Sequence, residues 1–189
     1  WSMGPVVTIN SATLMNKGLE IIEAHYLFGV PYSKIEAVIH PQSVVHSMVE
    51  FKDGSTVAQA SPPNMKGPIA YAISYPERIA HATPAIDWST AMSWEFRPID
   101  HKKYPAIEIA KEVGALASGP TIMNAANESA VSAYIEGKLS FVGIMDVVSR
   151  VLDTMSDVSK NEIRSFDDVS AIEENARMRA DHIIQAGGK

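Results

Sequence analysis

Four side chains between residues 11 and 20 carry the groups needed to bind an anion and a divalent cation. Ser11 has a hydroxyl and Asn16 an amide, while Lys17 has an ammonium group and Glu20 a carboxylate. On a helix, Glu20 would lie four residues after Asn16 and three after Lys17, so these side chains would be neighbours. We expect Ser11 just before this helix, where free backbone N–H groups favour an anion. The spacing predicts a phosphate site beside a carboxylate suited to Mg²⁺ or Mn²⁺.

The surrounding sequence predicts the elements that position these side chains. Residues 6–10 (VVTIN) are rich in β-branched residues and predict a strand, whereas residues 13–28 predict an amphipathic helix. Residues 35–40 predict another short strand. Residues 44–60 predict a hairpin that turns at Asp53-Gly54. The first part of the chain should therefore mix helices with a small sheet.

The later part of the chain changes character twice. Residues 81–105 combine prolines with tryptophans and predict an extended connector that packs through its aromatic side chains. Apolar residues then recur with helical spacing over 106–117, 122–136, 141–155 and 169–185. The sequence Ser165-Phe166-Asp167-Asp168 resembles a capping box with Asp in place of Glu. We predict an α+β fold in three domains: 1–80 (partial catalytic and dimerisation domain), 81–105 (connector) and 106–189 (four-helix bundle).

Composition excludes several classes of protein. A net charge of −6 argues against nucleic acid or an anionic membrane as the main partner, and no apolar run is long enough to cross a membrane. The sequence has no cysteine, which excludes disulfides and thiolate metal sites and fits a reducing compartment. The first residues do not form a signal peptide and look like an internal position in a longer chain. We expect a cytoplasmic location of the bacterial type.

The same residues also have a plainer interpretation. An exposed glutamate three residues after a lysine is most often a surface ion pair on a helix. Ser11 would then cap the helix, and Asn16 and Lys17 would be solvated. Judged from spacing alone, this interpretation is the commoner one for Glu20.

Several longer motifs resemble the 1-deoxy-D-xylulose 5-phosphate reductoisomerase family. The motifs occur in the family's order along the chain: WSMG, SATLMNKGLE, HPQSVVHSM, DGS, SPPNM and NAANE. The resemblance covers essentially all 189 residues. It implies an NADPH-dependent and divalent-metal-dependent oxidoreductase and isomerase of non-mevalonate isoprenoid biosynthesis. It also implies that about half of the family's chain, on the N-terminal side, is absent.

The resemblance assigns roles to individual residues. It makes Glu20 a metal ligand, together with an Asp and a Glu from an Asp-Ser-Glu motif that this sequence lacks. It makes Lys17 and Glu20 catalytic, and it places both at the substrate with Ser11 and Asn16. The resemblance also places Trp1 and Met65 at the substrate.

Three further positions match family motifs. Gly4 matches a glycine that contacts the dinucleotide. Asn10 stands where many family members carry Asp, and the NAANE motif, which contains Asn127, is expected to be architectural.

The resemblance also implies an overall function for the protein. These 189 residues contain no G-x-G-x-x-G motif, so we expect no dinucleotide fold of their own. The family isomerises and reduces deoxyxylulose phosphate, a sugar phosphate, to 2-C-methyl-D-erythritol 4-phosphate. We expect the isolated chain to be inactive, to bind neither cofactor tightly and to form a homodimer. The alternatives are a non-catalytic dimerisation or scaffold module and, less favoured, an unrelated phosphosugar-binding protein.

Overall fold

The computed structural model describes residues 3–187, which form two compact units. The first unit joins the segment that ends at Glu36 to the segment that begins at Asp100, and the second comprises residues 37–99. The fold is α+β, as predicted. The units cut across the predicted domains because helix α2, near the N-terminus, packs against helix α4 beyond residue 100. The predicted functional domains 1–80, 81–105 and 106–189 differ from these compact units and stay a prediction.

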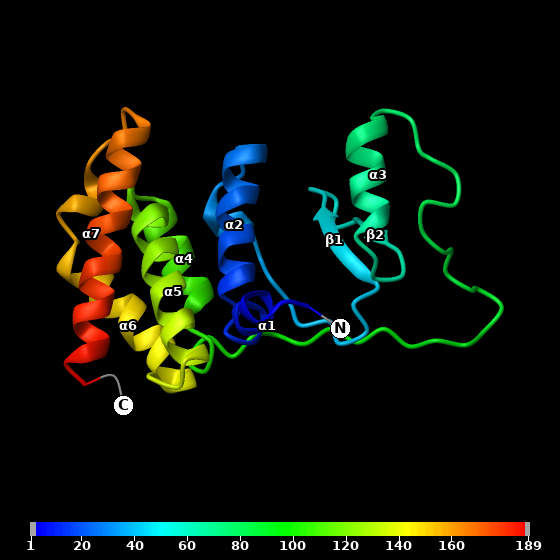
Figure 1. Ribbon diagram of the computed structural model, residues 1–189. Coiled ribbons are helices and arrows are strands. Elements are labelled where there is room, and N and C mark those ends of the chain that lie inside the picture. The colour runs from blue at the N-terminus through cyan, green and yellow to red at the C-terminus, as the bar shows by residue number, and fades with distance from the viewer. Residues whose placement is uncertain (1–2, 188–189) are drawn as a thin grey trace. The chain divides into compact units, whose positions relative to one another are not determined.

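Within the described residues, the regular elements of the first unit are all helices. Its α-helices are α1 (Pro5–Ala12), α2 (Met15–Phe28), α4 (Ala106–Gly114), α5 (Gly119–Ile135), α6 (Phe141–Thr154) and α7 (Phe166–Gln185), with 3₁₀ turns at Tyr32–Lys34 and Val158–Lys160. Helix α5 is central, since it contacts α1, α4, α6 and α7 (Figure 1). The four helices predicted after residue 105 are confirmed within the described residues, while the domain bounds of 106–189 stay a prediction.

Apolar packing around α5 holds this unit together. Ile122 and Met123 of α5 are fully buried with Ile144 and Val147 of α6. Burying side chains of this size stabilises a fold by about 1.5–3 kcal/mol each. The core also includes Met15 from the N-terminal segment, which is fully buried. The candidate site residues on α2 are thus attached to the rigid centre of the unit.

The predicted capping box at the start of α7 is confirmed. The Ser165 hydroxyl accepts a hydrogen bond from the Asp168 backbone N–H at 3.1 Å, and the Asp168 carboxylate accepts one from the Ser165 N–H at 3.0 Å. The Arg164 N–H also donates to this carboxylate, at 2.9 Å. Together these hydrogen bonds lower the pKa of Asp168, mainly through the Arg164 N–H.

The predicted strand over residues 6–10 is wrong, because these residues lie in α1. Pro5 stands at the first helical position and Gly4 is extended before it, an arrangement that favours a helix start. The Thr8 hydroxyl donates to the Gly4 carbonyl at 3.0 Å, as a helical threonine can. The strand preference of β-branched residues is weak and is overridden by burial of Ile9 in the helical core.

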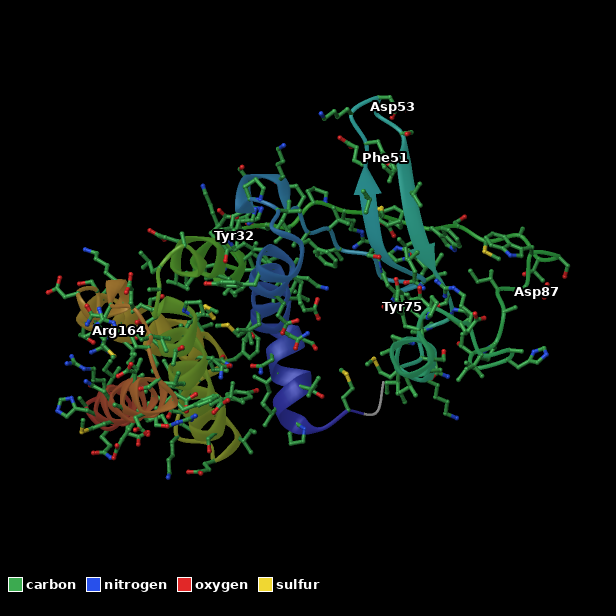
Figure 2. The ribbon with its side chains drawn as sticks, turned by 90° about the horizontal axis from the view of Figure 1, so that it is seen from above. Tyr32, Phe51, Asp53, Tyr75, Asp87 and Arg164 are labelled. Carbon is green, nitrogen blue, oxygen red and sulfur yellow. The ribbon has the colours of Figure 1, made fainter. Side chains whose placement is uncertain are left out.

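The second unit contains the predicted hairpin. Strand β1 (Val45–Glu50) pairs antiparallel with β2 (Thr56–Ala60), with Val49 opposite Val57. Asp53 lies at the turn with Phe51 next to it (Figure 2). The Asp53 carboxylate accepts hydrogen bonds from the Ser55 hydroxyl at 2.6 Å and the Ser55 N–H at 2.9 Å. Gly54 has a φ of 83°, which only a glycine adopts without strain.

The predicted strand over residues 35–40 is also wrong. Only Ile39 forms a bridge there, with Arg97, through two backbone hydrogen bonds of 2.9 Å. Pro41 follows directly after His40 and has no N–H with which to extend the pairing. The connector residues 81–105 contribute this bridge and no helix or longer strand. The unit's remaining regular element is α3 (Lys66–Ser74).

Within residues 3–187, no helix has the length and apolar character needed to cross a membrane.

Candidate phosphate-binding and metal-ligand site

The joint between α1 and α2 fixes where the candidate site begins. Thr13 is buried, and its hydroxyl donates to the Ile9 carbonyl at 3.1 Å and accepts from the Met15 N–H at 3.3 Å. Leu14 has a φ of 61°, an uncommon left-handed conformation for a leucine. This turn ends α1 and starts α2 two residues later than predicted. Sequence reasoning missed Thr13, although a threonine at a helix junction is a known signal for such bonding.

One face of α2 carries a connected polar cluster. The Asn16 side-chain amide donates to Glu20 Oε1 at 2.7 Å, and the Lys17 ammonium group forms an ion pair with Glu20 Oε2. Both charged side chains are nearly half exposed. The structure therefore brings together three of the four predicted side chains, at the predicted helical spacing.

The opposite face of α2 fixes the position of the helix that carries these side chains. Gly18 is buried, and a Cβ atom added to it would lie 2.9 Å from Ala110 Cβ and 3.1 Å from the Ala106 carbonyl oxygen. The backbones of α2 and α4 thus approach more closely than any larger residue would allow. Ile21 and Ile22 are buried on the same helix, so Lys17 and Glu20 remain on the solvent side.

Ser11 is not where the sequence analysis placed it. It is exposed in the last turn of α1 instead of preceding the first turn of α2. The Met15 N–H is already bonded to the Thr13 hydroxyl. It is therefore not free for an anion, as the prediction required. The four candidate side chains thus lie on two consecutive helices, with Ser11 on α1 and the other three on α2.

The residues present fit one metal-ligand position. Glu20 has an anionic carboxylate, but both of its oxygens are bonded to side chains of the same helix. Over the described range 3–187, no three His, Asp or Glu side chains gather as a metal site would require. Mg²⁺ and Mn²⁺ prefer several oxygen ligands, so Glu20 by itself does not hold such an ion.

The other predicted site residues are spread along the chain. Gly4 is exposed and precedes α1, with open space where a side chain would stand. Met65 belongs to the second unit, where it precedes α3 and is 69% exposed. Trp1 lies outside the described residues. Gly4 and Met65 are therefore accessible residues, and their roles stay predictions.

A hydrogen bond that sequence reasoning did not anticipate connects α1 to α5. Asn127 is fully buried, and its amide donates to the Asn10 side-chain oxygen at 3.0 Å. Asn10 immediately precedes Ser11. The NAANE motif was the available signal, but nothing in the sequence shows which distant residue its last asparagine meets.

Two known protein-family profiles match parts of this sequence. The sequence profile of the DXP reductoisomerase C-terminal domain matches residues 60–179, and that of the 1-deoxy-D-xylulose 5-phosphate reductoisomerase C-terminal domain matches residues 1–28. Both profiles class the chain with the C-terminal region of a reductoisomerase. The chain belongs to the 1-deoxy-D-xylulose 5-phosphate reductoisomerase family. The resemblance seen in the sequence motifs is thereby confirmed.

Individual relatives agree with this membership. The reductoisomerase of Kitasatospora griseola is 54% identical over 181 residues, which are 95% of this chain and 47% of the relative. The Zymomonas mobilis enzyme, solved in complex with NADPH, superimposes with a TM-score of 0.89 at 39% identity, covering 95% of this chain and 47% of that one. Another reductoisomerase, solved with NADPH, fosmidomycin and magnesium, gives 0.91 at 38% identity, covering 98% and 47%. The chain spans about half the length of the curated relatives it matches.

Proposed function

We propose that this chain forms the substrate-side part of an enzyme that isomerises and reduces deoxyxylulose phosphate to 2-C-methyl-D-erythritol 4-phosphate. The observation that carries the proposal is the exposed cluster of Asn16, Lys17 and Glu20 on α2. It combines anion-binding and cation-binding groups within one helical turn. Relatives of the same family have been solved with NADPH and with magnesium.

In this proposal the residues of α1 and α2 bind the phosphate and hydroxyl oxygens of the sugar. Lys17 supplies positive charge, while Ser11 and Asn16 donate hydrogen bonds. An exposed ion pair such as Lys17–Glu20 is worth about 0–1 kcal/mol, whereas a charge-assisted hydrogen bond is worth about 1.5–3 kcal/mol. Because the ion pair is exposed and weak, a phosphate group would compete with Glu20 for Lys17.

Release of Lys17 leaves Glu20 able to face a cation. A divalent cation, when bound, supplies Lewis acidity and a template, and NADPH supplies the hydride. Because Glu20 fits one ligand position only, the other ligands would come from the rest of a full-length reductoisomerase. Met65 would line the pocket, Gly4 would approach the dinucleotide, and Trp1 would contact the substrate.

The proposal is tested by NADPH oxidation in the presence of deoxyxylulose phosphate and Mg²⁺. The family-length protein is a protein of the family's full length that carries these residues. We expect turnover from this family-length protein. We expect none from the 189-residue chain alone, whose intact mass must be verified. A family-length protein that binds no sugar phosphate would overturn the proposal.

We also propose that the hairpin associates with a second copy of the chain. Val49 and Val57 are cross-strand partners, yet they are 58% and 62% exposed. Phe51, next to the turn, is 51% exposed. Adjacent apolar side chains on a sheet face gain stability when covered, and a two-fold dimer covers both copies at once. The cytoplasmic location expected from the sequence remains a prediction.

A further inference from the structure

Asn127 is a buried polar residue that is only partly satisfied by its surroundings. Its side chain is fully buried in α5, and its amide nitrogen donates to Asn10 Oδ1 at 3.0 Å. Its own Oδ1 atom is also buried and finds no hydrogen-bond partner within the described residues. A buried oxygen without a partner is costly, so a well-packed core would favour an apolar residue here. The bond to Asn10 is therefore the one polar contact that the Asn127 side chain makes within the described residues.

The helix that receives this bond is short and mostly exposed. Helix α1 has eight residues, fewer than an isolated helix needs to be stable in water. Ile9 is its one buried residue, and Val6 and Val7 are both exposed. The hydrogen bond from α5 therefore acts together with the burial of Ile9 to fix the orientation of α1.

Asn10 is also well placed to transmit this restraint. It lies in the last turn of α1, directly before Ser11, and the Thr13 hydroxyl is 3.3 Å from its carbonyl oxygen. The next residue, Leu14, begins the joint to α2. A displacement of Asn10 would therefore move both the Ser11 hydroxyl and the start of α2.

We infer that Asn127 is a positioning residue for the phosphate site, acting through Asn10 to hold the last turn of α1 and with it Ser11. The inference rests on the proposed function in taking Ser11 as a phosphate contact. Asn127 itself does not touch the substrate. Its loss leaves α1 loose, so that substrate binding must order the helix and loses affinity accordingly.

Steady-state kinetics of the family-length protein test this role. Asn127→Ala should raise KM for deoxyxylulose phosphate by about 3- to 10-fold, the equivalent of one hydrogen bond, and leave kcat within about twofold. Asn10→Ala should do the same. The double variant should be no worse than either single variant, because both remove one interaction.

A conservative variant distinguishes positioning from general damage. Asn10→Asp keeps an oxygen acceptor for the Asn127 amide, so its KM should stay within about twofold of the wild type. When Asn10→Asp is combined with Asn127→Ala, the KM should rise as it does in Asn127→Ala alone. Asn124→Ala is the matched control, since this amide bonds to Glu128 of its own helix at 3.0 Å.

Amide hydrogen exchange gives a readout that needs neither substrate nor activity. Asn127→Ala should speed exchange over residues 5–14, while Asn124→Ala should not. Unchanged exchange in Asn127→Ala, or additive KM effects in the double variant, would overturn the inference. If Asn127→Ala does not fold, the KM values of Asn10→Ala and Asn10→Asp decide. A raised KM in Asn10→Ala alone supports the inference, and equal KM values overturn it. A wild-type protein without turnover would refute the proposed function. The hydrogen-exchange result would then still test whether Asn127 holds α1 in place.

Discussion

The Asn16 amide donates a 2.7 Å hydrogen bond to Glu20 Oε1, one turn further along α2. Lys17 pairs with the other oxygen of the same carboxylate, so Glu20 is oriented from both sides before any ligand arrives. When Lys17 turns to a phosphate, the Asn16 bond still orients the carboxylate, so Glu20 loses little rotamer freedom on meeting a cation. The cluster is thus organised by its own helix, and the neighbouring helix α4 only sets where α2 lies.

Glu20→Gln in the family-length protein should lower turnover by about 100-fold or more, because it removes an anionic metal ligand. The amide keeps the size of the side chain, so folding should be unaffected. Initial rates of NADPH oxidation at saturating Mg²⁺ measure the effect. Glu23→Gln, an exposed carboxylate on the same helix, is the control and should behave as the wild type. A Glu20→Gln rate within about threefold of the wild type would show that Glu20 is a surface residue only.

Lys17→Ala should lower kcat/KM for the sugar phosphate by roughly 10- to 150-fold, since a charge-assisted contact is worth about 1.5–3 kcal/mol. Ser11→Ala should lose about 0.5–1.5 kcal/mol, as expected for a neutral hydroxyl. Lys34→Ala and Ser33→Ala, both exposed, serve as matched controls. A larger loss in Ser11→Ala than in Lys17→Ala would reverse the ranking of the two roles.

Gly18→Ala should destabilise the protein by about 1–3 kcal/mol, because the new Cβ would lie 2.9 Å from Ala110 Cβ. Alanine is intrinsically the better helix former by about 1 kcal/mol, so the net loss must come from the clash with α4. Gly67→Ala in α3 is the control, since its nearest neighbour, Thr83, would be 3.4 Å away. Urea unfolding of the two variants measures the difference. Equal midpoints would mean that the α2–α4 approach relaxes freely.

Asp168→Ala should lower the melting temperature near neutral pH by removing the carboxylate of the capping box. The pKa of Asp168 is lowered in the folded protein, mainly by the Arg164 N–H. Its stabilising effect is therefore complete above its ordinary pKa of about 4 and is lost as the pH falls through the folded-state pKa. The difference between variant and wild type should shrink in acid. Asp167→Ala, one residue earlier, should show a smaller effect at neutral pH.

Val49→Lys combined with Val57→Lys should convert a dimer into monomers, because two charges would replace the exposed apolar pair on one face of the hairpin. Light scattering over a concentration series measures the mass. Glu50→Lys with Thr56→Lys alters the next cross-strand pair, which lies on the other face, and should leave the mass unchanged. A wild-type protein that is monomeric at high concentration would refute association through the hairpin.

The sequence correctly predicted those parts of the fold that depend on residues close together in the chain. The hairpin turn at Asp53-Gly54, the capping box at Ser165 and the cluster around Glu20 all depend on residues within a few positions of one another. The strand predicted over residues 6–10 failed because burial of Ile9 against distant helices decided its conformation.

The candidate site shows the same limit. Its spacing along α2 was readable, but the bond between Asn10 and Asn127 joins residues 117 positions apart. The left-handed turn at Leu14 was equally hidden, since leucine gives no hint of a positive φ. Both features depend on tertiary packing, which a single sequence does not display.

The close crossing at Gly18 makes the segment from Asn16 to Glu20 intolerant of any change in length. Each helical residue turns the chain by about 100°, so a single insertion there would rotate Glu20 away from Asn16 or push a side chain into Ala110. Substitutions can be absorbed one at a time, but an inserted codon would separate the ligand-facing positions from the helix-facing ones. We therefore expect the family to vary freely in the composition of its surface loops and to keep the residue count of this one turn fixed.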